Sequence, residues 1–206
     1  MKVLKRIAVA AVGLIVLAYL GLAGALYAKQ QSLLFRPDTT RVDPASVGLA
    51  RVREVTLNAP DQPRLLGWHT APADALRPVF LYLHGNAASL ARRASRFEFL
   101  TRDGAGLLAL SWRGYGGSEG EPGETGFHAD VAMALAFLKR EGVEPERIIL
   151  FGESLGSGIA VMTAARTPVK GLILDSPYLS IAEIAAGRYW WLPVSLLLSH
   201  PFEPFL

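Results

Sequence analysis

One heptapeptide limits the possible fold more than any other stretch of the chain. Residues Gly152–Gly158 read Gly-Glu-Ser-Leu-Gly-Ser-Gly, and they separate an apolar strand-like run from a small-residue helical run that ends near Ala165. Gly152, Ser154 and Gly156 fit a pattern in which a serine stands at a tight strand-to-helix turn. Such a turn strains the serine backbone, and glycines on either side remove side chains that would collide there. The pattern therefore predicts a strand, a sharp turn and a helix, with the Ser154 hydroxyl above a sheet.

The chemistry predicted for this turn is nucleophilic attack by Ser154. The helix after the turn directs its first N–H groups at the place where an oxyanion would form. A second polar loop, His84 to Ala88, follows the apolar run 79–83 and contains a glycine. We expect the backbone N–H groups of Asn86 and Leu155 to form an oxyanion hole. A glycine-rich phosphate turn is the weaker interpretation, because the G-x-G-x-x-G spacing and a P-loop lysine are missing.

The N-terminus contains an uncharged run of 22 residues, Ile7 to Ala28. At about 1.5 Å per residue this run can cross the roughly 30 Å core of a bilayer. We expect an uncleaved single-pass anchor, because the run is longer than the usual apolar region of a signal peptide. A cleaved signal peptide and a helix of a soluble core remain the alternatives. Lys2, Lys5 and Arg6 precede the run and favour a cytoplasmic N-terminus, which places the following domain on the periplasmic or extracellular side.

Charge and composition exclude several classes of function for the rest of the 206-residue chain. The three basic residues before the anchor account for the net charge of +3, and the remaining 18 basic residues balance 18 acidic ones. This balance gives no signal for nucleic-acid binding. The chain has no cysteine, which rules out disulfides, thiolate metal sites and a cysteine nucleophile. No cofactor or metal is predicted.

The chain after the anchor alternates between strand and helix patterns. We expect residues 1–28 to form the tail and anchor, 29–50 a polar linker, and 51–206 an α/β domain. The expected strands are 52–57, 65–70, 79–83, 107–111, 148–151 and 169–174. The expected helices are 89–102, 127–141 and 178–198, the last interrupted near Pro193. This alternation predicts a mostly parallel sheet with helices on both faces and a ligand site at the carboxyl ends of the strands.

Three segments near the predicted site allow several interpretations. Arg92, Arg93 and Arg96 lie on one predicted helix, and we expect them to form its solvated face rather than a phosphate site. The loop 114–123 is expected to form a wall of the substrate cleft. The apolar C-terminal segment with Trp190 could cap an acyl-chain pocket, lie at the membrane surface or belong to the core.

Three motifs occur in order at the ends of predicted strands, and together they resemble the α/β-hydrolase superfamily. They are Leu83-His84-Gly85-Asn86-Ala87, Arg113-Gly114-Tyr115-Gly116-Gly117-Ser118-Glu119-Gly120 and Gly152-Glu153-Ser154-Leu155-Gly156. With Asp175-Ser176-Pro177-Tyr178, the chain resembles more narrowly the membrane-anchored, Bem46-like branch of abhydrolase-domain proteins. The resemblance covers residues from about 51 onward. It implies hydrolysis of an ester, thioester or amide through an acyl-enzyme, without cofactor or metal. The expected substrate is a small molecule, a lipid or an acyl-protein, the last two indicated by the apolar C-terminal region and the membrane anchor.

The resemblance also implies an acid and a histidine later in the chain than Ser154. We expect these residues, with two further strands and about 50–60 residues, beyond Leu206. Asp175 and His200 follow Ser154 in the required order and are the substitutes inside the chain, while His84 is expected to order its own loop. The sequence thus predicts an incomplete α/β-hydrolase fold after one transmembrane helix, weak or inactive alone. The alternative is a non-catalytic fragment or a membrane-bound interaction module.

Overall fold

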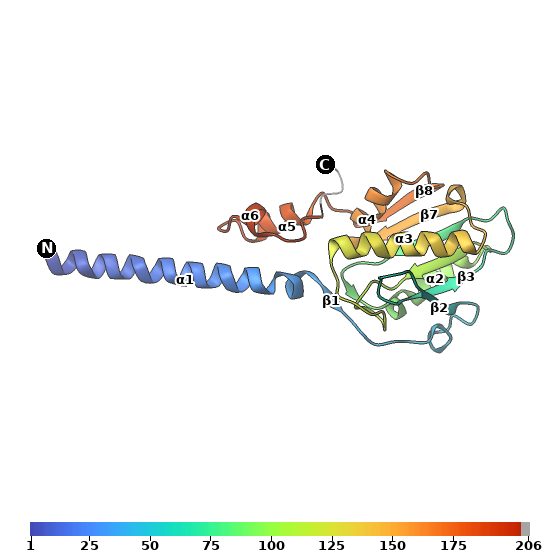
Figure 1. The fold of residues 1–206 in the computed structure, drawn as a ribbon, viewed down its shortest axis with the longest axis horizontal. Helices are drawn as coiled ribbons and strands as arrows, with labels where there is room; N and C mark the ends of the chain where they lie inside the picture. The colour runs from blue at the N-terminus through green and yellow to red at the C-terminus, as the bar shows by residue number, and fades with distance from the viewer. Residues whose placement is uncertain (203–206) are drawn as a thin grey trace.

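The predicted N-terminal anchor is one long helix that stands out from the rest of the protein (Figure 1). The structure, a computed structural model, describes residues 1–202. Helix α1, Lys2–Leu34, has no buried residue and is long and apolar enough to cross a membrane, with a mean hydropathy of 2.4 over 18 residues. The helix continues through 29–34, which we had expected to begin the linker. Strand β1, Arg36–Pro37, follows it directly and pairs with β5, Ala87–Ala88.

A six-stranded, mostly parallel sheet forms the centre of the domain. Its strands are β2 (Arg53–Leu57), β3 (Leu65–Thr70), β4 (Val79–Leu83), β6 (Gly106–Leu110), β7 (Ile148–Glu153) and β8 (Gly171–Asp175). Their spatial order is β2-β3-β6-β4-β7-β8. Strand β3 runs antiparallel to both β2 and β6, whereas β6, β4, β7 and β8 are parallel. The predicted α/β fold, with an antiparallel pair at one edge, is confirmed.

Helices cover both faces of this sheet. Helices α3 (Glu124–Arg140) and α4 (Leu155–Ala164) pack on one face, and the 3-10 turn η2 (Leu90–Arg93) with helix α2 (Ala94–Thr101) packs on the other. Strand β4 has apolar side chains on both faces. Leu81 and Leu83 belong to the hydrophobic core under α3 and α4, whereas Tyr82 contacts Phe97 of α2 on the other face, with ring centroids 5.0 Å apart. Apolar side chains on both faces of β4 require such double cover.

The C-terminal part of the described chain leaves the sheet and approaches α1. Two short helices, α5 (Ile181–Arg188) and α6 (Val194–Leu197), follow β8, and Pro193 precedes α6, as expected for a break there. Figure 1 shows both helices beside the end of α1 that adjoins the domain. The remaining short elements are the 3-10 turns η1 (Pro44–Val47) and η3 (Pro145–Arg147). Within the part of the chain that the structure describes, β8 is an edge strand, and its Leu172 and Ile173 side chains are exposed.

Candidate active site

Ser154 stands at the sharp turn between β7 and α4. Its φ of 48° and ψ of −116° lie in a region that residues with a side chain rarely adopt. The Ser154 N–H donates to the carbonyl oxygen of Asp175 at 2.8 Å, and the Ser154 carbonyl accepts hydrogen bonds from Ser157 N (2.8 Å) and Oγ (2.6 Å). These bonds hold both sides of the strained peptide. The backbone thus has the conformation that the sequence pattern predicts.

The two flanking glycines are required by close packing between helix α4 and the sheet. A Cβ atom at Gly156 would lie 2.1 Å from the carbonyl oxygen of Leu83, at the end of β4. A Cβ atom at Gly152 would lie 2.6 Å from the Cα atom of Ser157. Real Cβ atoms do not approach other atoms this closely, so α4 can begin where it does only because both positions lack side chains. This packing places the first N–H of α4, that of Leu155, next to Ser154.

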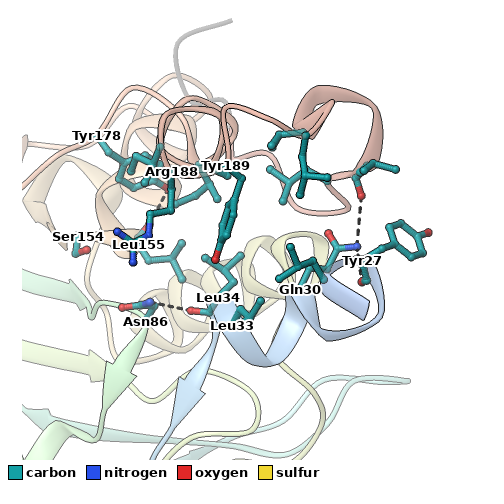
Figure 2. Close-up of a pocket in the computed structure, with 18 of the residues that line it drawn as sticks. Tyr27, Gln30, Leu33, Leu34, Asn86, Ser154, Leu155, Tyr178, Arg188 and Tyr189 are labelled. Carbon is teal, nitrogen blue, oxygen red and sulfur yellow. Dashed lines mark hydrogen bonds between the residues drawn. The ribbon is translucent and has the colours of Figure 1, made fainter. Parts of the chain in front are cut away.

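The loop after β4 faces the same space. Asn86 lies between β4 and β5, and Asn86, Ser154 and Leu155 line one cavity. The Asn86 carbonyl accepts from the Tyr115 hydroxyl and from the Arg36 N–H, both at 2.9 Å, so the loop is held in place. The Asn86 side-chain amide donates to the Leu34 carbonyl at 2.8 Å, which connects this loop to the end of α1 (Figure 2). The residues predicted to supply the oxyanion-hole N–H groups therefore lie on two elements that meet at Ser154.

A network of charged groups lies behind the turn. Glu153 accepts from Arg93 at two points, 2.6 Å and 2.8 Å, and also from the Tyr82 hydroxyl. Arg96 joins the network at 3.6 Å from Glu153 and 2.6 Å from Asp175. Burial acts to raise the pKa of Glu153, but the hydrogen bonds from Arg93 and Tyr82 outweigh it and lower the pKa below its usual value. Glu153 is therefore ionised and occupied, which makes it a structural group rather than a base.

Arg93 joins the two halves of the candidate oxyanion hole. Its guanidinium pairs with Glu153, next to Ser154, and also donates to the carbonyls of Ser89 (3.0 Å) and Ala87 (3.3 Å) in the loop that carries Asn86. The Arg93 side chain is only 12% exposed. The expectation that Arg92, Arg93 and Arg96 form a solvated helix face was wrong for Arg93. Arg92 is exposed as expected, and Arg96 is 38% exposed although it pairs with Asp175. No local signal marks this role of Arg93, because Arg93 and Glu153 are 60 residues apart in the sequence.

His84 is buried, and both of its ring nitrogens have hydrogen-bond partners. The Nδ1 atom lies 2.7 Å from the Gly85 carbonyl, and the Nε2 atom lies 3.4 Å from the backbone N–H of Trp112. This pattern requires a neutral ring with its proton on Nδ1. Burial, with the nearby charge of Arg93, lowers the pKa of His84 from 6.5 to about 3. His84 orders its own loop, as expected, and does not line the cavity at Ser154.

The structure does not bring Asp175 and His200 together with Ser154. The Asp175 carboxylate pairs with Arg96, and only the backbone carbonyl of Asp175 contacts Ser154. The His200 ring packs edge-on against Phe35 at 5.5 Å, and its Nδ1 atom lies 3.5 Å from the Glu124 N–H at the start of α3. Neither residue lines the cavity. Within residues 1–202, the substitute triad considered from the sequence is not assembled.

The cavity above Ser154 has a volume of about 520 Å³ and a mainly apolar wall (Figure 2). This size is typical of small-molecule sites, which range over about 300–1,000 Å³. The wall comes from the Asn86 loop, the turn at Ser154 and Leu155, the segment 176–198 and α1. The loop 114–123 does not contribute to it, contrary to expectation. Gly117 and Gly120 of that loop instead approach the side chains of Arg41, Leu66 and Pro63.

Comparison with known proteins gives relatives over nearly the whole chain. A family model described as alpha/beta hydrolase fold matches residues 78–201. Two uncharacterized proteins of Mycobacterium tuberculosis are 37% identical over 203 residues, which is 96% of this chain and 72% of theirs. Lysophosphatidylserine lipase ABHD12 of Danio rerio is 32% identical over 161 residues, covering 66% of this chain and 39% of the lipase.

Solved structures agree with this assignment. An alpha-beta hydrolase from Vibrio vulnificus has a TM-score of 0.62 and 29% identity, over 75% of this chain. An esterase from Pyrococcus furiosus, at 23% identity, shares the fold with a TM-score of 0.59. This chain spans 58% of the length of the Vibrio protein and 64% of the Pyrococcus esterase. The family match, the sheet order and the strained serine between β7 and α4 lead to the same conclusion: the chain belongs to the α/β hydrolase family.

Proposed function

We propose that the protein is a membrane-anchored serine hydrolase in which Ser154 attacks the acyl carbon of an ester, thioester or amide. The observation that supports this most directly is the strained Ser154 backbone, with the first turn of α4 and the Asn86 loop on the same cavity. In the proposed reaction the Ser154 oxygen bonds to the acyl carbon, and the N–H groups of Asn86 and Leu155 stabilise the oxyanion. The leaving group departs with a proton, and water then releases the acyl group from Ser154.

The proposal also concerns the proton that Ser154 must lose. In the described residues 1–202, no hydrogen bond joins the Ser154 hydroxyl to a histidine. The four histidines lie in strand β3, in the loop after β4, within α3 and after α6. We therefore expect the 206-residue chain to react slowly. Triad enzymes that lack a triad member still retain about 10³–10⁴-fold catalysis over water, from the oxyanion hole and binding. The acid and histidine implied by the resemblance remain a prediction.

A fluorophosphonate probe tests this function. We expect slow labelling of Ser154 in detergent micelles, accelerated by added imidazole, which can act as the missing general base. Ser154→Ala should abolish labelling. Ser176→Ala is the matched control, because Ser176 lines the same cavity and also has a positive φ, of 55°. Equal loss of labelling in both variants, or labelling that persists in Ser154→Ala, would contradict the assignment of Ser154.

One observation favours the alternative of a membrane-bound interaction module without catalysis. Among residues 1–202, strand β8 pairs on one side only and exposes Leu172 (37%) and Ile173 (40%), and such an edge can pair with another chain. The same labelling experiment distinguishes the hydrolase from the interaction module. If no serine is labelled even at high imidazole concentration, while the chain remains folded, the interaction module becomes the better interpretation.

A further inference from the structure

Helix α1 makes specific contacts with the domain in addition to anchoring it. Gln30 of α1 accepts from the Ser199 N–H at 2.8 Å through its side-chain oxygen and donates to the Leu197 carbonyl at 3.4 Å. Tyr19 donates to the Trp191 carbonyl at 3.2 Å, and the Tyr19 and Trp191 rings meet edge-on at 6.0 Å. These contacts join α1, near Tyr19 and near Gln30, to the segment that contains α5 and α6. A flexible tether would need none of them.

The space between these two segments is the cavity above Ser154. One face of α1 lines it, at the helical spacing expected of a single side: Ala23, Leu26, Tyr27, Gln30, Leu33 and Leu34. The opposite wall comes from 181–198, including Ile184 and Tyr189. Figure 2 shows Ser154 near one end of this space and Tyr27 near the other. The stretch from Ala23 to Leu34 is about 16 Å long at the helical rise, so the cavity is an elongated apolar channel rather than a round pocket.

The channel lies where the predicted membrane span ends. At the end of the channel away from Ser154, the α1 wall consists of residues Ala23 to Tyr27, which belong to the uncharged run that would lie in the bilayer. At the end near Ser154, it consists of Gln30 to Leu34, which lie beyond that run. The segment that faces α1 also exposes large apolar side chains, with Trp190 and Leu196 each 83% exposed. Aromatic and apolar groups so exposed are typical of a surface that lies at a membrane interface.

Ser154 and Asn86 are polar groups at one end of the channel, whereas the Gln30 amide, nearer Tyr27, is already bonded to Ser199 and Leu197. Among the described residues that line it, Arg188 is the one charged side chain, and Figure 2 shows it reaching toward Leu155. An occupant with a polar centre and a long apolar tail matches this distribution. The tail would replace contacts that α1 otherwise makes with lipid, and the polar centre would lie beside Ser154.

We propose that α1 is part of the substrate site: residues 23–34 form one wall of an acyl-chain channel, and the ligand is a long-chain acyl ester that enters from the bilayer. This inference rests on the proposed function and adds a substrate class and a route of entry to it. The ester carbon lies at Ser154, and the acyl chain extends along α1 toward Tyr27. The last turn of α1 also positions the Asn86 loop, through the bond between Asn86 and the Leu34 carbonyl.

The test compares two fluorophosphonates, one with a hexadecyl chain and one with an ethyl group, on the full chain in lipid nanodiscs with imidazole present. Leu26→Trp fills the channel. We expect it to slow labelling by the hexadecyl probe about tenfold. Each methylene of the probe that is buried in the channel favours binding, and excluding two methylenes from the channel is enough to weaken binding by this factor. Labelling by the ethyl probe should stay within about twofold of the parent. Ala28→Trp, at the same depth but outside the channel lining, should change neither rate. Equal effects of Leu26→Trp on both probes would overturn the proposal.

A second measurement separates failure of the channel from failure of the catalytic assignment. The Ser154→Ala chain is placed in vesicles with a lysophospholipid that carries a photoactivatable diazirine in its acyl chain. Crosslinks on both 23–34 and 181–198 support the channel even if Ser154 proves unreactive to both probes, in which case only the proposed function fails. Crosslinks confined to 7–22, as for ordinary lipid contact, would overturn the channel whatever the labelling shows.

Discussion

The strained backbone at Ser154 makes a prediction about stability that does not depend on catalysis. The Ser154 φ of 48° with ψ of −116° is unfavourable for any residue with a Cβ atom, and glycine alone adopts it without penalty. We therefore compare Ser154→Gly with Ser154→Ala. Both substitutions remove the hydroxyl, but only the glycine removes the Cβ atom that causes the strain.

The magnitude follows from two opposing effects. Relief of one strained residue is worth about 1–3 kcal/mol, whereas glycine increases the entropy of the unfolded chain and costs about 0.5–1 kcal/mol. The net expectation is that Ser154→Gly is more stable than Ser154→Ala by about 1 kcal/mol, which corresponds to a Tm higher by about 2–4 °C for a chain of this size. Ser154→Ala itself should be close to the parent, because the Ser154 hydroxyl makes no hydrogen bond among the described residues.

Urea unfolding in detergent, followed by tryptophan fluorescence, measures these differences. Both variants should lose fluorophosphonate labelling, so that any gain in stability is separated from activity. If Ser154→Gly is equal to or less stable than Ser154→Ala, the turn is not strained and the argument for an exposed, preorganised nucleophile loses its main physical support.

Two further predictions concern the elements that hold this turn. Burial lowers the pKa of His84 from 6.5 to about 3, so at acid pH the unfolded chain binds a proton that the folded chain does not. The contribution of the neutral ring to the free energy of unfolding is therefore fully present above pH 6.5 and is lost as the pH falls toward 3. The loss should reach about 2 kcal/mol at pH 5, and His84→Gln should flatten the difference in urea midpoint between pH 7.5 and pH 5; an unchanged difference would contradict the buried neutral ring. Gly156→Ala, whose Cβ would lie 2.1 Å from the Leu83 carbonyl oxygen, should lower the free energy of unfolding by about 3 kcal/mol, at the upper end of overpacking effects, whereas Gly187→Ala in α5, with nothing within 4 Å, should not destabilise. Similar urea midpoints for the two alanine variants would mean that α4 does not pack tightly on β4.

Much of the fold could be predicted from local patterns. The continuous apolar run of β4, the alternating run of β2 and the helical spacing of α3 each depend on residues close in sequence, so their positions agree with the structure to within a few residues. The glycines around Ser154 are similarly informative. Their spacing predicts a close approach of backbone, and the structure shows which atoms approach, including the Leu83 carbonyl.

The roles of the arginines could not be predicted in this way. Arg93 and Glu153 are 60 residues apart, and nothing local distinguishes an arginine that reaches a glutamate across the sheet from one that faces water. The same holds for α1. Its apolar composition predicts a membrane helix, but its contact with Trp191 joins residues 172 apart and depends on where α5 and α6 fold back.

The sequence by itself therefore determined the order of strands and helices, the membrane-spanning length of α1 and the turn at Ser154, because these follow from short-range sterics and hydrophobic periodicity. Only the tertiary structure decided that Arg93 connects Glu153 to the Asn86 loop, that the Asp175 carboxylate and His200 have other partners than Ser154, and that α1 forms a wall of the cavity. These features arise where separate segments meet in space, and contacts of that kind are set by the packing of the whole chain.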